Sequence, residues 1–237
     1  MKIVPQSVHL VDYMGSDLSV VNAARVSFAK ESQLEFNTSG DVDLGSLSQK
    51  DIKLISYLAK HNHWSPFAHN SLTFRIKAPI FVARQLVKHQ VGGVWNEVSR
   101  RYVDDEPEFY LPALWHAKPE NAKQGASETT VDKIWWIEED SYYSVNESVA
   151  AITGRALWTY NQMLKNNIAP EEARMVLPLN TMTEWWWTGS LMFFARVCKQ
   201  RLDSHAQNAT REVAALIASS IPSEFQHSWL ALTQAGT

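Results

Sequence analysis

The chain has little cysteine and little net charge, and each shortage excludes a class of protein. Its single cysteine, Cys198, rules out an intramolecular disulfide framework and a multi-cysteine metal site, and it fits a reducing compartment such as the cytoplasm. A net charge of -3 gives no general attraction for nucleic acid, so a phosphate must be recognised by a few locally placed arginines and lysines. This charge pattern favours a small anionic ligand.

Long apolar runs are also missing. Acidic and polar residues interrupt the apolar positions of residues 1–19, which therefore match neither a secretory signal nor a transmembrane span. The aromatic run from Trp185 to Phe194 is too short to cross a bilayer, and we predict that it belongs to a buried helix. We expect a cytoplasmic protein that makes no use of a membrane.

What the chain does contain is typical of one globular unit. It has 237 residues, of which 45% are hydrophobic and 20% are charged, and it has no internal repeat. We predict a single domain over residues 1–237. Within it, a polar and poorly patterned stretch predicts a surface insertion at about residues 113–130.

The periodicity of apolar residues predicts a mainly helical protein with some sheet. Alternation over residues 71–77 predicts a half-buried strand, and Gly92 and Gly93 predict a loop over residues 91–105. A capping box at Ser48 and Pro170 at a first turn mark two helix starts. The predicted helices cover residues 17–28, 48–59, 79–89, most of 131–164, a short stretch from 170, 185–200 and 204–219.

Polar side chains gather in two segments, residues 61–67 and residues 84–102. On a helix, two pairs of residues four apart project from one end: Arg84 with Lys88, and Gln85 with His89. Arg100 and Arg101 add planar donors that match two phosphate oxygens at once. The spacing indicates an anion pocket, although a solvated basic loop capping the helix fits the same spacing.

Several short segments follow the motif order of one enzyme family. KAPIFVARQLVKHQ followed by WNEVSRRY is similar to the signature region of flavin-dependent thymidylate synthases. Further segments that resemble the family are NAARVSF, HNHWSPFAH, FYLP, EEARMVLPLN and RLDSHAQ. The family signature reads Arg-His-Arg, seven residues and serine, whereas this chain has Lys88-His89-Gln90, eight residues and Ser99. Lysine keeps the charge without the bidentate fork, and glutamine keeps neither.

The resemblance implies both a fold and a reaction. The fold is α+β, a predominantly helical single domain with a small, mainly antiparallel sheet. The reaction is the reductive methylation of dUMP to dTMP on bound FAD, with 5,10-methylenetetrahydrofolate as one-carbon donor, NADPH as reductant and tetrahydrofolate as product. The resemblance also implies a homotetramer with sites shared between subunits, and binding of neither nucleic acid nor membrane.

The resemblance assigns site residues by position. The positions that match FAD contacts are His63, Ser65, Lys88, His89, Gln90, Glu97, Ser190, Met192 and Arg196, of which Met192 and Arg196 do not carry the usual side chains. Those that match dUMP contacts are Gln85, Lys88, Glu97, Ser99, Arg100, Arg101, Arg174 and Arg201. For catalysis we select Arg201, Ser99 and His63.

Arg201 is the principal catalytic candidate. A guanidinium beside the uracil N3 and its carbonyl favours the ionised base and activates its C5 carbon. The residues alone leave an ion pair with Asp203 as the alternative role. Cys198 could instead attack the uracil C6 carbon, but the resemblance assigns no nucleophile there and we predict buried packing. His61 and His63 lack a third ligand nearby, so we predict no metal site.

Two other functions remain open at this point. The altered charges at Lys88 and Gln90, with the longer loop, fit a family member that binds flavin or nucleotide without methylating. The VSRRY segment and the tryptophans fit a nucleic-acid-binding protein, against which the net charge of -3 argues. Retained flavin would separate the nucleic-acid-binding protein from the active enzyme and from the non-methylating family member. Turnover would separate the active enzyme from the non-methylating family member.

Overall fold

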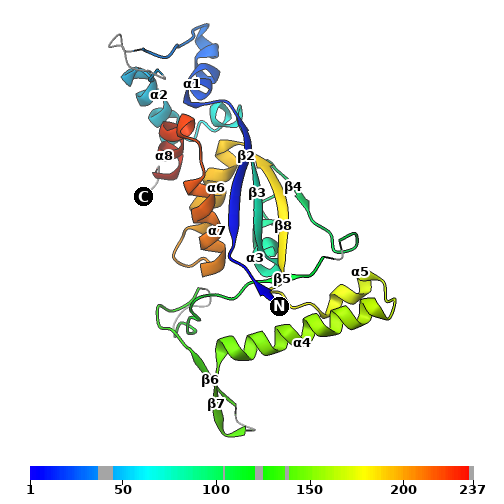
Figure 1. Cartoon of the computed structure of the whole chain (residues 1–237). Coiled ribbons are helices and arrows are strands. Elements are labelled where there is room, and N and C mark those ends of the chain that lie inside the picture. Colours follow the sequence, from blue (N-terminus) through cyan, green and yellow to red (C-terminus); the bar gives the residue numbers. More distant parts are fainter. Residues whose placement is uncertain (37–44, 104, 121–124, 137–138, 235–237) are drawn as a thin grey trace.

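A four-stranded antiparallel sheet lies at the centre of the computed structural model, which describes residues 1–36, 45–103, 105–120, 125–136 and 139–234 (Figure 1). Its strand order is β2 (Ser7–Met14), β3 (Ser71–Pro79), β8 (Met182–Gly189) and β4 (Gly93–Glu97). Two small sheets pair β1 (Lys2–Ile3) with β5 (Glu108–Phe109) and β6 (Lys133–Trp136) with β7 (Ser141–Ser144).

All the helices of the described residues except α3 form three groups around this sheet. Helices α6 and α7 lie along the sheet, α1, α2 and α8 gather beyond one of its ends, and α4 with α5 extends as an arm beyond the other (Figure 1). Their bounds are α1 Asp17–Arg25, α2 Gln49–Lys60, α3 Ile80–Leu86, α4 Val145–Lys165, α5 Pro170–Ala173, α6 Leu191–Arg201, α7 Asn208–Ser219 and α8 Gln226–Gln234. Short 3-10 turns cover Val26–Phe28, Ser65–Ala68, Arg174–Val176 and Ser223–Phe225.

The main core forms between the sheet and helices α6 and α7. Strand β3 turns Leu72, Phe74 and Ile76 inward, which confirms the predicted alternation. Strand β8 does the same with Trp185 and Trp187, and these five side chains are almost completely buried. Each such burial contributes about 1.5–3 kcal/mol relative to exposure. The sheet thus fixes where the helices that follow its strands begin.

A second core joins the two ends of the chain. Val20, Val21 and Ile55 are fully buried between α1, α2 and α8. The buried carboxylate of Asp17 accepts hydrogen bonds of 2.8 Å from the backbone N–H groups of His227 and Ser228, at the start of α8. Those N–H groups have no partner inside their own helix, so Asp17 satisfies them.

The structure confirms the predicted fold class and several predicted elements. It is a mixed α and β fold with a small antiparallel sheet, and its structural relatives reported below share it. Helices occur as predicted over residues 17–28, with a 3-10 last turn, and over residues 48–59. The Ser48 side chain accepts a hydrogen bond of 3.2 Å from the Asp51 N–H, as a helix cap does.

The single helix predicted over residues 185–200 is wrong. Residues 182–189 form strand β8, and helix α6 begins only at Leu191, after the cap residue Ser190. Trp185 and Trp187 are buried and Trp186 is half exposed, which is the period of a strand. A run of aromatic residues does not reveal this period, because every position in it is apolar.

Two other assignments need correction. Residues 91–105 were expected to form a loop, but residues 93–97 form the edge strand β4. Residues 131–164 were expected to be mostly helical, but they begin with the β6–β7 hairpin, and helix α4 starts at Val145. Strand β4 forms by pairing with β8, which is far away in the sequence, whereas β6 and β7 pair with each other as a local hairpin of aromatic residues that favour strand. Residues 121–124 and 137–138 of these predictions lie outside the described residues.

The ring of Phe193 packs against two glycines, Gly93 and Gly189, at the junction of β8 and α6. Gly93 and Gly189 are partners in the β4–β8 register. A Cβ atom at Gly189 would lie 2.3 Å from Phe193 Cδ1, and one at Gly93 would lie 2.4 Å from Phe193 Cζ. The ring therefore occupies the space that two side chains would need.

Substituting Gly189→Ala should destabilise the protein by roughly 1–3 kcal/mol, because the new methyl group overpacks a filled core. Gly154→Ala is the matched control: it lies inside α4 with no atom within 4 Å of the added Cβ, so alanine should be neutral or stabilise by about 0.5–1 kcal/mol. Urea denaturation of the three proteins measures both effects. Equal stability of Gly189→Ala and wild type would contradict the packing described here.

Candidate active site

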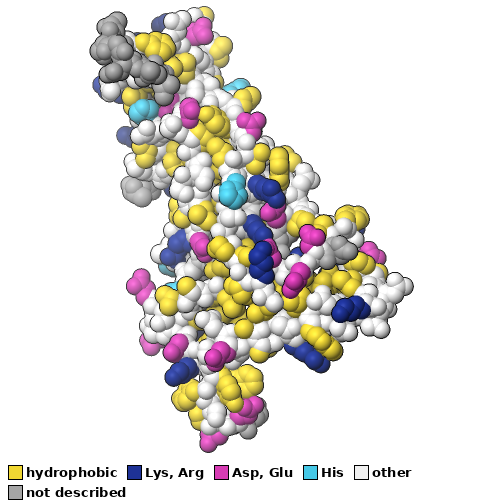
Figure 2. Space-filling view, in the orientation of Figure 1, with side chains coloured by type: hydrophobic (Ala, Val, Ile, Leu, Met, Phe, Trp, Pro, Cys, Tyr) yellow, Lys and Arg dark blue, Asp and Glu magenta, His cyan; other side chains and the backbone are white. Residues whose placement is uncertain are grey.

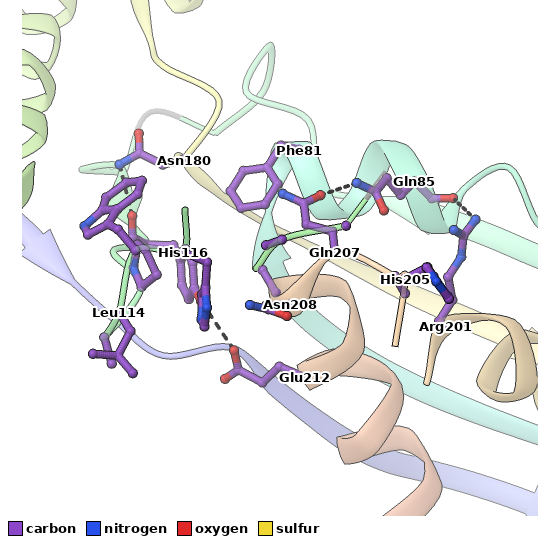
Figure 3. Close-up of a pocket in the computed structure, with 18 of the residues that line it drawn as sticks. Phe81, Gln85, Leu114, His116, Asn180, Arg201, His205, Gln207, Asn208 and Glu212 are labelled. Carbon is purple, nitrogen blue, oxygen red and sulfur yellow. Dashed lines mark hydrogen bonds between the residues drawn. The ribbon is translucent and has the colours of Figure 1, made fainter. Parts of the chain in front are cut away.

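The end of α6 meets the end of α3 and the start of α7 around one cavity of about 830 Å³ (Figure 3). Gln85 comes from α3, Arg201 from α6, and Gln207 from the cap of α7. Phe81 and Tyr110 supply aromatic surface to the same cavity. The structure therefore brings together Gln85 and Arg201, two residues predicted to bind nucleotide.

Arg201 makes its hydrogen bonds to neutral groups. Its Nε donates to Nε2 of His89 at 2.9 Å, and its Nη2 approaches the backbone carbonyl of Gln85 at 3.4 Å. The alternative ion pair with Asp203 is wrong, because the Asp203 carboxylate binds His205 instead, with its Oδ1 at 2.9 Å from the His205 Nδ1. Within the described part of the chain, no carboxylate lies within 4.0 Å of the Arg201 guanidinium. Its positive charge is thus uncompensated.

His89 stays neutral in this position. Burial, and then the nearby charges of Arg201 and Arg196, together lower the pKa of His89 from 6.5 to about 4. Because Nε2 accepts the Arg201 hydrogen bond, the ring proton of the neutral imidazole lies on Nδ1. An imidazole orients the guanidinium without neutralising it.

The opposite end of the cavity carries a carboxylate. Glu212 Oε2 accepts hydrogen bonds from Gln6 Nε2 at 2.6 Å and from the Tyr110 hydroxyl at 3.4 Å. Burial, and then the charge of Glu212, raise the pKa of Tyr110 to about 12, so its phenol stays protonated. The cavity thus has a cationic end at Arg201 and an anionic end at Glu212.

The predicted insertion forms part of the cavity wall. Its described residues pair as a ribbon: the Ala117 N–H donates to the Thr129 carbonyl and the Val131 N–H to the Trp115 carbonyl, each at 2.8 Å. The Trp115 Nε1 donates to Asn146 Oδ1 at 2.7 Å and anchors the ribbon to α4. The lining residues are Ala113, Leu114, Trp115, His116, Gly125 and Ala126. Sequence reasoning missed this wall, whose one signal was Trp115-His116 at the edge of a polar stretch.

A second cavity, of about 410 Å³, collects the second predicted flavin-contacting stretch. Ser190, Met192 and Arg196 line it together with Trp64 and Gly92. Arg196 Nη2 donates to the backbone carbonyl of Val91 at 2.7 Å, which ties helix α6 to the loop before β4. The Ser190 hydroxyl accepts from the Phe193 N–H at 3.2 Å as the cap of α6. Trp64 is 62% exposed and offers a flat apolar surface.

The remaining predicted residues do not line either cavity. Glu97 faces its own sheet, where it accepts from the Thr183 hydroxyl at 2.7 Å and from Trp95 Nε1 at 3.1 Å. Arg174 lies exposed at the end of α5, on the arm. The others, which lie outside both cavities within one chain, are His63, Ser65, Lys88, Gln90, Ser99, Arg100 and Arg101.

Cys198 is unsuited to nucleophilic attack. Its side chain is fully buried, its Sγ lies 3.5 Å from the Ala214 carbonyl, and burial raises the pKa of its thiol to about 12. The predicted buried packing is confirmed. Across the described residues, no three His, Cys, Asp or Glu side chains gather closely enough to hold a metal ion, and no helix is long and apolar enough to cross a membrane.

Comparison with known proteins identifies the family. The model of the family described as thymidylate synthase complementing protein matches residues 9–225. The chain is 39% identical to a flavin-dependent thymidylate synthase of Thermotoga neapolitana, over 89% of this chain and 83% of that protein. It is 37% identical to one of Ehrlichia ruminantium, over 96% of this chain and 69% of that protein. The chain belongs to this family.

A solved structure has the same fold. The UMP/dUMP methylase PolB from Streptomyces cacaoi, bound with 5-Br dUMP, superposes with a TM-score of 0.78 at 28% identity, covering 100% of this chain and 98% of the other. A second structure of that methylase, bound with 5-Br UMP, gives the same TM-score at 27% identity.

Replacing His89 by glutamine should reduce the loss of stability in mild acid. The folded state holds the pKa of His89 at about 4, against 6.5 for the free side chain, so between these values only the unfolded chain binds the proton. Stability must therefore fall as the pH drops through this range. The His89→Gln variant lacks the part of this loss that comes from His89, and it keeps an acceptor for Arg201. Urea midpoints of wild type and His89→Gln at pH 7 and pH 5 measure the loss of stability. An equal drop in the two proteins would contradict the lowered pKa of His89.

Proposed function

We propose that this chain is a flavin-dependent thymidylate synthase, which methylates the uracil of dUMP at C5 to give dTMP. The one-carbon donor is 5,10-methylenetetrahydrofolate, the reductant is NADPH, and the cofactor is FAD. The observation that carries the proposal is the uncompensated guanidinium of Arg201, held by neutral groups in a cavity inside a chain of this family.

Arg201 acts on the base by electrostatics. Uracil becomes nucleophilic at C5 when negative charge develops on its N3 and carbonyl oxygen, and a cation at that edge stabilises the charge. At 4 Å and an effective dielectric of 20 the attraction between unit charges is about 4 kcal/mol. A carboxylate partner would cancel most of this field, whereas His89 holds the guanidinium and leaves it intact.

The second cavity fits part of a flavin. Its flat Trp64 wall, open Gly92 and the donors of Arg196 suit an aromatic ring with carbonyl acceptors. Pockets for drug-sized ligands span about 300–1,000 Å³, and a dinucleotide such as FAD exceeds what about 410 Å³ can enclose. A bound flavin would supply the hydride chemistry that no side chain provides. The other predicted contacts for it are His63, Ser65, Lys88, His89, Gln90 and Glu97.

The phosphate of dUMP requires cations that one subunit does not place in the main cavity. Arg201 is the only arginine or lysine among the described residues that line it, and Glu212 repels an anion. Ser99, Arg100 and Arg101 on one loop, and Arg174 on the arm, lie outside this cavity. We propose that a neighbouring subunit contributes these donors in a homotetramer.

Exposed apolar side chains support subunit association. Figure 2 shows them over the hairpin of β6 and β7 at the foot of the molecule. Trp135 and Tyr142 are 45% and 67% exposed there, and Trp136 and Tyr143 are 38% and 37% exposed. Aromatic side chains left this open on a projecting hairpin are typical of surfaces that a partner covers.

UMP is a second candidate substrate. The structural relative that spans the whole chain is described as a UMP/dUMP methylase and has been solved with both brominated nucleotides. The same cavity and the same role of Arg201 serve either nucleotide, because the two differ only at the ribose. Methylation assays with dUMP and UMP side by side decide between one substrate and two.

Tritium release from dUMP labelled at C5 tests the reaction. FAD, NADPH and methylenetetrahydrofolate are supplied together and then omitted one at a time, and release should require all three. Folded, flavin-loaded protein that releases no label would point to the family member that binds without methylating. Protein that retains no flavin and binds DNA strongly would instead support the nucleic-acid-binding alternative.

Arg201→Ala should lower tritium release by at least about a hundredfold, the typical effect of losing a group that stabilises transition-state charge. Flavin absorbance of the purified variant should match that of wild type, since Arg201 lies outside the second cavity. Lys53→Ala, at an exposed position on α2, is the matched control and should keep wild-type turnover. Turnover by Arg201→Ala within a few fold of wild type would remove Arg201 from the chemistry.

Cys198→Ala should retain methylation. The thiol is buried and protonated at neutral pH, so its loss should cost only about 1 kcal/mol of stability. Single-turnover assays on folded, flavin-loaded protein measure the rate. A variant that keeps fold and flavin but loses turnover would reopen attack by the cysteine.

A further inference from the structure

A chain of hydrogen bonds connects the interior of α7 to the main cavity through Gln85. The Thr210 hydroxyl donates to Gln85 Oε1 at 3.0 Å, and Gln85 Nε2 in turn donates to Gln207 Oε1 (Figure 3 draws the second bond). Thr210 is fully buried, whereas Gln85 and Gln207 both line the cavity. A buried hydroxyl thus has a cavity-lining amide as its partner.

These hydrogen bonds fix which way the side-chain amides of Gln85 and Gln207 face. A carboxamide has an acceptor oxygen at one end and donor N–H groups at the other. With the Gln85 oxygen bound to Thr210, its nitrogen faces Gln207, and the Gln207 oxygen is used in turn. Among the described residues, the Gln207 Nε2 donates to no partner, so its N–H groups remain for a ligand.

We propose that Thr210 is a positioning residue that makes Gln85 and Gln207 present N–H donors, and not acceptors, to the nucleotide. Such donors suit the carbonyl oxygens of the uracil and the phosphate oxygens of the nucleotide, which accept hydrogen bonds. The inference rests on the proposed function, because it assigns nucleotide binding to this cavity.

Gln85 also contacts Arg201, but through its backbone. The backbone carbonyl of Gln85 lies 3.4 Å from Arg201 Nη2, and a rotation of the side-chain carboxamide leaves that carbonyl, and so the guanidinium, in place. Valine has nearly the shape of threonine but no hydroxyl. In Thr210→Val the Gln85 oxygen loses its donor, and the carboxamide is free to turn its oxygen toward the ligand.

The test compares Thr210→Val with Thr210→Ser in flavin-loaded protein. The dUMP dissociation constant is measured by calorimetry without folate or NADPH, and KM and kcat are measured by tritium release. Thr210→Val should raise Kd and KM about five- to tenfold, the effect of one hydrogen bond, with kcat within about twofold. Thr210→Ser should bind like wild type, because it keeps the hydroxyl.

Gln207→Glu and Gln207→Ala test the direction of the amides. Glutamate keeps the acceptor for Gln85 but replaces the cavity donors by a negative charge, so it should weaken dUMP binding more than alanine does. If Gln207→Glu bound dUMP as tightly as Gln207→Ala or tighter, the amides would face the other way and the inference would be wrong.

The outcomes separate this inference from the proposed function. Wild-type affinity in Thr210→Val, or equal loss in Thr210→Val and Thr210→Ser, overturns only the role of the hydroxyl. Failure of wild-type protein to bind dUMP overturns the proposed function, and the inference falls with it. Thermal melting of each variant identifies any loss that comes from misfolding.

Discussion

The hydrogen bond between Arg201 and His89 depends on where two helices begin, because each helix follows one of two adjacent strands. Helix α3 follows β3, and helix α6 follows β8. Strands β3 and β8 are antiparallel, so α3 begins at the end of the sheet where β8 starts, with Pro79 opposite Met182. Helix α6 begins at the other end and must run back along the sheet to reach α3. Its 11 residues cover about 16 Å, which brings its last residue, Arg201, to the end of α3. The length of α6 thus sets where Arg201 lies relative to His89.

The sequence predicted those parts of this arrangement that are encoded locally. The alternation of Leu72, Phe74 and Ile76 identified β3, and the Ser48 cap identified α2. Strands β4 and β8 were missed because their evidence lies in pairing with neighbours. Motif resemblance placed Gln85 and Arg201 in one site, which the structure joins in one cavity. It could not indicate the insertion wall or the bond from Thr210, because both depend on contacts between residues far apart in the chain.

The charges in the main cavity are the basis of the proposal that subunits share the site. The two charged ends, Arg201 and Glu212, suit a ligand that is polar but not strongly anionic within this space. In the proposed function, a nucleotide phosphate lies toward donors outside this cavity. The aromatic side chains of the hairpin and Arg174 are both exposed, as the proposed sharing of sites between subunits requires.

The burial of Cys198 has a practical consequence for studying subunit association in solution. Because it is the only cysteine and its thiol is shielded and protonated, the wild-type chain should behave toward maleimide reagents as if it had none. A cysteine introduced at Tyr142 on the hairpin would then be the single labelled position. A fluorophore there would report the approach of another subunit without first replacing Cys198.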